Sequence, residues 1–179
     1  EGMVYAGAVR SRYPRARVLS IDTSKALALA GVIAVYTADD IPGNRKVGHL
    51  KQDWDALIAV GHVTHYLGDA ICLVVAESQE LVEQAKELVE ISYEELPPLG
   101  CPKEALAEGA PVVHGGTDTN ILSHEHLVRG NADQMIADSA YKVTRHYETP
   151  FTEHAFLEPE CAVAMPFDDG VFISSTDQE

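Results

Sequence analysis

The segment that follows Ser78 has the clearest periodicity in the chain, and it constrains the fold more than any other feature. Its apolar residues recur at the spacing of one helical face, and charged residues occupy the opposite face. The apolar residues are Leu81, Val82, Ala85, Leu88 and Val89, and the charged ones are Glu80, Glu83, Lys86, Glu87 and Glu90. Ser78 is a residue type preferred at helix N-caps. The pattern predicts an amphipathic helix from Ser78 to about Leu88, laid on a mixed sheet.

Short strands are expected on both sides of this helix. Runs rich in Val, Ile, Ala and Tyr between turn residues predict strands at 4–10, 16–21, 32–36, 62–66, 70–76 and 89–94. A second, shorter helix is expected from Lys25 to Ala30, capped by Asp22 or Thr23 and ended by a left-handed Gly31. Residues 102–107 predict one more short helix. This order of elements predicts an α+β domain.

The stretch from Gly109 to Asn120 is small, polar and rich in turn residues, and it is the best candidate for a linker. We therefore expect a first domain over residues 1–110, a linker over 111–120 and a second domain over 121–179. In the second domain, one or two helical turns are expected at 132–139, an alternating strand at 142–149, and a hairpin that pairs 161–165 with 171–174. This domain looks unfinished, so residues from Ile121 onward are expected to pack poorly or to depend on a partner.

The charge balance excludes several kinds of partner. The chain has 13 basic and 28 acidic residues, a net charge of −15, and such a surface repels nucleic acid and anionic lipid. It has no run of 18 apolar residues, so no membrane span is expected. Its three cysteines are scattered and form no CxxC pair, which argues against zinc and iron–sulfur sites and favours reduced thiols in a cytoplasm. Cys72 is interpreted as a small buried hydrophobic residue.

Histidines and arginines supply three weaker hypotheses. His124 and His126 could present two imidazoles on one face of an extended segment, but ordinary surface histidines are favoured. In a strand, His62 and His65 would point to opposite faces, which argues against a shared metal ion. Four arginines could form a local basic patch, a basic strand edge or a subunit contact; these are Arg10, Arg12, Arg15 and Arg17.

No complete catalytic arrangement is evident from the residues alone. The carboxylates Glu153, Glu158 and Glu160 lie close together in sequence, but acid–base hydrolysis needs two carboxylates facing each other across a substrate. Structural use of these residues is favoured. The chain contains no phosphate-binding glycine loop and no GxSxG nucleophile turn.

Three stretches together resemble the xanthine dehydrogenase/aldehyde oxidase family of molybdenum hydroxylases. The tracts 5–11, 31–43 (GVIAVYTADDIPG) and 66–76 (YLGDAICLVVA) are similar to the α/β-hammerhead domain that opens the large subunits of this family. The tracts 130–133 (GNAD) and 137–138 are similar to the entry into the cofactor-binding domain. The tract 153–160 (EHAFLEPE) resembles the family's E-H-(F/A)-(Y/F)-L-E motif. The resemblance covers nearly the whole chain, and the motifs occur in the family's order.

The resemblance implies a fragment of an oxidoreductase. The intact enzyme would hydroxylate a purine, a related N-heterocycle or an aldehyde at a molybdenum–pterin cofactor. Iron–sulfur and FAD groups would belong to partner subunits, and a homodimer is left open. Residues 121–179 would be the truncated start of the molybdenum-cofactor-binding domain. The family's glycine-rich cofactor loop and late catalytic glutamate have no counterpart in this chain, so we expect the fragment alone to hold no catalytic residue and to be inactive.

One tract carries the expected cofactor contact. The family's S-T-Q motif, whose glutamine approaches the molybdenum, is similar to the tract 174–178 (SSTDQ). Aligned without a gap, Asp177 takes the place of the glutamine; with one inserted residue, Gln178 does. A carboxylate there would change the charge beside the metal and with it the substrate preference.

Two other functions remain open at this point. The chain could be a stand-alone acidic α+β domain that mediates subunit contacts without catalysis, or a hydrolase that uses the carboxylates of 153–160. The complete reading frame discriminates between them. An end near Glu179 would favour the interaction domain, whereas a glycine-rich loop and a late glutamate would support the molybdenum hydroxylase.

Overall fold

The computed structural model describes residues 2–48, 51–113, 115–155, 157 and 159–176. The chain divides into two compact units, Glu1–His126 and Leu127–Glu179, which are described separately. The first unit contains the helix and most of the strands expected from the sequence.

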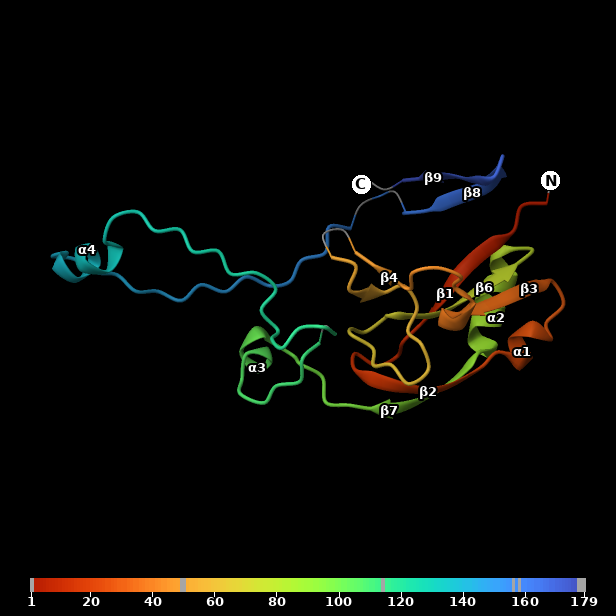
Figure 1. Ribbon diagram of the computed structural model, residues 1–179, viewed down its shortest axis with the longest axis horizontal. Coiled ribbons are helices and arrows are strands. Elements are labelled where there is room, and N and C mark those ends of the chain that lie inside the picture. The colour runs from red at the N-terminus through yellow and green to blue at the C-terminus, as the bar shows by residue number, and fades with distance from the viewer. Residues whose placement is uncertain (1, 49–50, 114, 156, 158, 177–179) are drawn as a thin grey trace. The chain divides into compact units, whose positions relative to one another are not determined.

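The first unit is built on a three-stranded sheet with a helix on one face. The strands β1 (Tyr5–Arg10), β6 (Ala70–Ala76) and β3 (Val32–Thr37) lie in the order β1-β6-β3. Both pairings are antiparallel, so the expected mixed sheet is wrong for the described strands. Strand β6 lies in the centre of the sheet with a strand on each side, and its apolar side chains are mostly buried. Helix α2 (Gln79–Leu88) lies along β1 and β6 (Figure 1).

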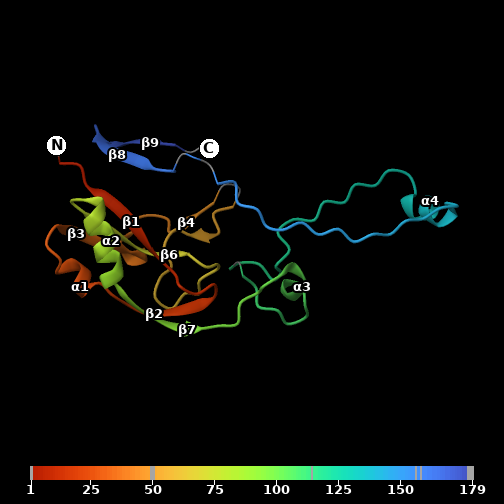
Figure 2. The ribbon, with the colours of Figure 1, turned by 180° about the vertical axis from the view of Figure 1, so that it is seen from behind.

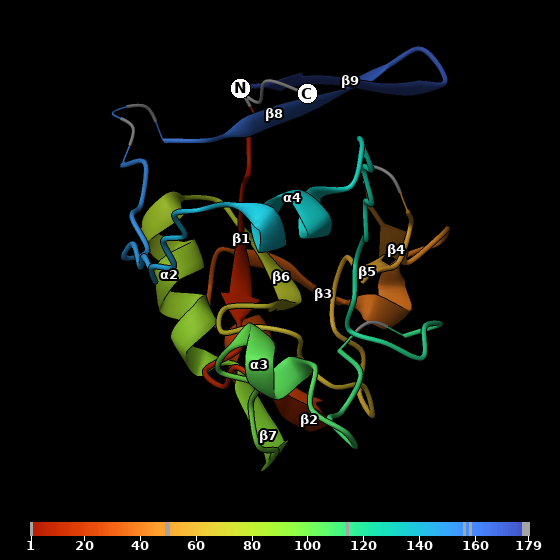
Figure 3. The same ribbon diagram turned by 90° about the vertical axis from the view of Figure 1, so that its left-hand side faces the viewer.

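The amphipathic pattern of α2 is confirmed. The Ser78 hydroxyl accepts a hydrogen bond from the Leu81 backbone N–H at 3.3 Å, which caps the helix. Val82 and Ala85 are buried against the sheet, and Leu81 and Leu88 pack at the edge of the core. The other buried members of this core are Val9, Ala26, Cys72, Val74, Ala76 and Val89. Figure 3 shows α2 beside β1 and β6.

A second layer of the first unit is a two-stranded ribbon. Strands β2 (Ala16–Asp22) and β7 (Glu90–Glu95) pair antiparallel and form no part of the larger sheet (Figure 2). Val18, Ile58 and Ile71 are fully buried in a smaller core next to it. The strand expected at 62–66 is wrong: only Val63 forms a bridge, to Arg17.

The shorter elements depart from expectation in detail. Helix α1 (Ser24–Leu27) ends before the expected Ala30, and Gly31 has the expected positive φ of 90°. Thr23 precedes the helix without capping it; instead the Asp22 carboxylate accepts from the Ser24 backbone N–H at 2.9 Å. The remaining elements of this unit are the 3₁₀ turn η1 (Ala38–Asp40), β4 (Lys46–Val47), β5 (Trp54–Asp55) and α3 (Pro102–Ala105).

The segment expected as a linker folds back on α3. The Asn120 side-chain amide donates to the carbonyl oxygens of Ala105 and Pro111, at 2.9 and 3.0 Å. Its carbonyl oxygen accepts from the backbone N–H of Val113 at 2.9 Å. Residues 111–126 accordingly group with the first unit. No helix in the described part of the chain is long and apolar enough to cross a membrane.

The second unit has little packing of its own. It contains α4 (Ala132–Asp138) and the hairpin of β8 (Ala162–Phe167) and β9 (Gly170–Ser175), which confirms the expected helical turns and hairpin. Every described residue from Leu127 to Thr176 is exposed, as expected for residues that pack poorly. The strand expected at 142–149 is not formed, because no described strand lies beside it to supply the ladder of hydrogen bonds.

The cysteines offer a direct test of the first core. Cys72 lies in the middle of β6, where burial raises the pKa of its thiol to about 11, while Cys101 and Cys161 are exposed. Only a thiolate reacts rapidly with a thiol reagent. In a colorimetric thiol titration of the native chain we expect two cysteines to react within minutes and Cys72 only after unfolding. Three equally fast thiols in the native chain would contradict the burial of Cys72.

Candidate functional site

Polar side chains converge in the first unit between residues 54 and 69, around the buried carboxylate of Asp69. Asp69 is 1% exposed, and one of its oxygens, Oδ2, accepts from the backbone N–H of His65 at 2.8 Å. The same oxygen lies 3.0 Å from Nδ1 of the His65 ring. An ionised aspartate carboxylate only accepts hydrogen bonds, which favours the tautomer with the proton on Nδ1; Nε2 points to the other side of the ring.

Asp55 lies on that other side. Its Oδ2 is 4.0 Å from Nε2 of His65 and 3.9 Å from Nδ1 of His62. Its Oδ1 is 2.8 Å from the ammonium of Lys46. The Trp54 ring lies over the His65 ring, with centroids 4.8 Å apart. The expectation that His62 and His65 point to opposite faces is therefore wrong, because the segment is a compact turn rather than a strand.

This histidine–carboxylate cluster joins three parts of the first unit. The β4–β5 hairpin supplies Asp55, the turn supplies His65 and Asp69, and the end of β1 is bonded to the same turn. The backbone N–H of Ser11 donates to the Asp69 carbonyl oxygen at 2.8 Å, and the N–H of Gly68 donates to the Ser11 carbonyl oxygen at 3.1 Å. Among the described residues, no group of three His, Cys, Asp or Glu could hold a metal ion. The geometry supports a role in fixing the turn.

Sequence reasoning missed this cluster, although one signal was present. Asp69 stands between a glycine turn and a buried apolar strand, a position where a carboxylate needs donors close by. The turn that follows His65 supplies these donors, because it brings His65, four positions before Asp69, back to the Asp69 carboxylate.

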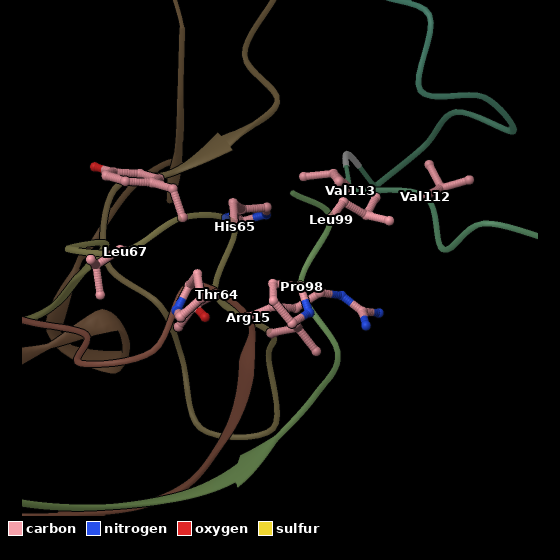
Figure 4. Close-up of a pocket in the computed structure, with 11 residues that line it drawn as sticks. Arg15, Thr64, His65, Leu67, Pro98, Leu99, Val112 and Val113 are labelled. Atoms are coloured by element: carbon pink, nitrogen blue, oxygen red, sulfur yellow. The ribbon is translucent and has the colours of Figure 1, made fainter. Parts of the chain in front are cut away.

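A pocket of about 300 Å³ adjoins the cluster. Figure 4 shows His65 and Thr64 on one side of it, with Leu99 and Val113 facing them. The Thr64 hydroxyl accepts from the backbone N–H of Ala16 at 2.9 Å, so it is already occupied. The lining is mostly apolar and contains no activated nucleophile. The pocket can hold an apolar group, but its residues do not form a catalytic arrangement.

The four arginines do not form a free basic patch. Their guanidinium groups are directed at partners distant in sequence within the first unit. The contacts are Arg10 with the Gly68 carbonyl (3.0 Å), Arg12 with Glu87 (3.8 Å), Arg15 with the Pro97 carbonyl (3.0 Å), and Arg17 with Glu94 (3.1 Å) and the Gly61 carbonyl (2.9 Å). They link residues 10–17, which include the β1–β2 connection, to α2, the 61–68 turn and residues 94–97.

The other sequence-based candidates are exposed or lie outside the described residues. Asp177 and Gln178, the two candidates for the cofactor contact, lie outside them, and so does Glu158. Glu153 is exposed and lies 3.8 Å from Nδ1 of His154. Glu160 is exposed as well. The rings of His124 and His126 are 6.3 Å apart on an exposed segment.

The helix-covered antiparallel sheet and the separate β2–β7 ribbon define an α+β domain of the hammerhead class. Residues 1–97 match the family model described as "Aldehyde oxidase and xanthine dehydrogenase, a/b hammerhead domain". The chain belongs to this family.

Several known proteins resemble the chain over nearly its whole length. A probable xanthine dehydrogenase subunit of Bacillus subtilis is 37% identical over 96% of this chain and 22% of its own length. The nicotinate dehydrogenase large molybdopterin subunit of Eubacterium barkeri is 38% identical over 94% of this chain and 39% of its own. The solved structure of the aldehyde oxidoreductase from Desulfovibrio gigas matches 97% of this chain and 20% of its own, with a TM-score of 0.89 and 29% identity. The chain thus spans well under half of these relatives.

The described residues do not by themselves form a cradle for a molybdenum–pterin group. Next to Asp177, the described residues Ser174, Ser175 and Thr176 are exposed, and the Thr176 hydroxyl is 3.1 Å from the backbone N–H of Cys161, from which it accepts. The pocket of about 300 Å³ lies in the first unit, among apolar side chains. The described residues of this chain therefore do not fit a molybdenum–pterin group.

Proposed function

We propose that this chain is the N-terminal part of the large, molybdenum-binding subunit of a xanthine dehydrogenase-like oxidoreductase. The observation that carries the proposal is the length of the match. Relatives named as xanthine dehydrogenase and nicotinate dehydrogenase subunits align with 94–96% of the chain at 37–38% identity, across both units. A likeness restricted to the hammerhead domain would fit a stand-alone contact domain equally well.

The division of the chain follows from this proposal. Residues 1–110 are the hammerhead domain, 111–120 the linker, and 121–179 the start of a cofactor-binding domain completed by polypeptide beyond this chain. Asp177 or Gln178 approaches the molybdenum in the complete subunit. The exposure of every described residue from Leu127 to Thr176 supports an incomplete domain, because a finished domain buries a core of its own.

The complete enzyme hydroxylates a purine, a related N-heterocycle or an aldehyde. The molybdenum–pterin group supplies the oxygen-transfer chemistry when bound. Iron–sulfur and FAD groups are carried by other subunits, and the location is the cytoplasm. The 179-residue chain alone neither holds the cofactor nor catalyses the reaction. A cofactor site needs a rigid supporting shell of residues, and the 179-residue chain alone does not supply that shell.

Metal content and turnover test the proposal. The polypeptide of the complete reading frame is to be purified with its partner subunits, and the 179-residue chain by itself. We expect about one molybdenum per complete subunit and turnover of hypoxanthine, nicotinate or a simple aldehyde with an artificial electron acceptor. The 179-residue chain is expected to be folded, free of molybdenum and inactive.

Either of two results would overturn the proposal. Stoichiometric molybdenum with turnover in the 179-residue chain would show that it is not an incomplete fragment. A complete subunit without molybdenum or pterin, loaded under conditions that load a known relative, would favour a contact domain without catalysis.

A further inference from the structure

We draw no further inference here: the strongest candidate, the pocket of about 300 Å³ in the first unit that residues 63–67, Leu99, Val112 and Val113 line together with Arg15, is a mostly apolar surface of a chain that matches only 20% of the length of the aldehyde oxidoreductase, and nothing in the structure shows what covers it.

Discussion

Replacing Asp69 by alanine is expected to lower the free energy of unfolding of the first unit by roughly 2–5 kcal/mol. The carboxylate is buried and is the acceptor for two groups of His65, the backbone N–H and the ring Nδ1. Alanine leaves both donors, which are part-buried, without their acceptor, and each unsatisfied buried group costs about 1–3 kcal/mol. The turn that they stabilise also holds the end of β1 through Ser11.

Urea unfolding followed by fluorescence measures this loss. Trp54 is the only tryptophan and lies on the His65 ring, so its emission reports on the cluster directly. Asp39→Ala is the matched control, because the Asp39 carboxylate is exposed and forms a surface ion pair with Arg45 at 2.9 Å. Such a pair contributes about 0–1 kcal/mol. If Asp69→Ala and Asp39→Ala change the unfolding midpoint equally, the cluster does not stabilise the turn.

Gly7→Ala is expected to destabilise the first unit by about 1–3 kcal/mol, although alanine suits a strand better than glycine does. Gly7 lies in the middle of β1, under α2. A Cβ atom at this position would stand 2.6 Å from Cγ1 of Val82, closer than real Cβ contacts allow. Valine in a helix has one strongly preferred rotamer, so the methyl group cannot easily turn away. The helix would have to move off the sheet.

A double-mutant cycle isolates this contact. Val82→Ala removes the obstructing methyl group and alone costs roughly 1.5–3 kcal/mol of buried apolar surface. The double variant Gly7→Ala/Val82→Ala is expected to be more stable than the sum of the two losses predicts, by about 0.5–3 kcal/mol. Gly43→Ala is the control, because a Cβ atom there meets nothing within 4 Å. Strict additivity of the two substitutions would show that the helix does not approach the strand at Gly7.

The periodicity of 78–89 was sufficient to predict α2, its Ser78 cap and its buried face. Local chemistry decides such a feature, because one hydroxyl caps the helix and the spacing of Val82 and Ala85 defines the face. The hairpin of β8 and β9 was predictable for a similar reason, since a short turn joins two apolar runs that pair with each other. Cys72 was likewise placed in the core by the apolar run around it.

The candidate site was predictable only in part. The resemblance to the family pointed to Asp177 or Gln178, and that assignment stays a prediction because both lie outside the described residues. The cluster of Asp69, His65 and Asp55 escaped sequence reasoning. Its three members come from a hairpin and a turn whose mutual approach is set by the packing of other residues, and periodicity carries no information about that approach.

By itself the sequence determined the helix, most of the strands and the family to which this protein belongs, because spacing, capping and motif order are properties of neighbouring residues. Only the tertiary structure decided which strands pair. The β1 and β2 strands are adjacent in sequence, yet they belong to separate sheets. The tertiary structure also decided that residues 142–149, although patterned as a strand, form none within the described chain. A strand exists only where another backbone completes its hydrogen bonds, and the fold as a whole determines which backbone that is.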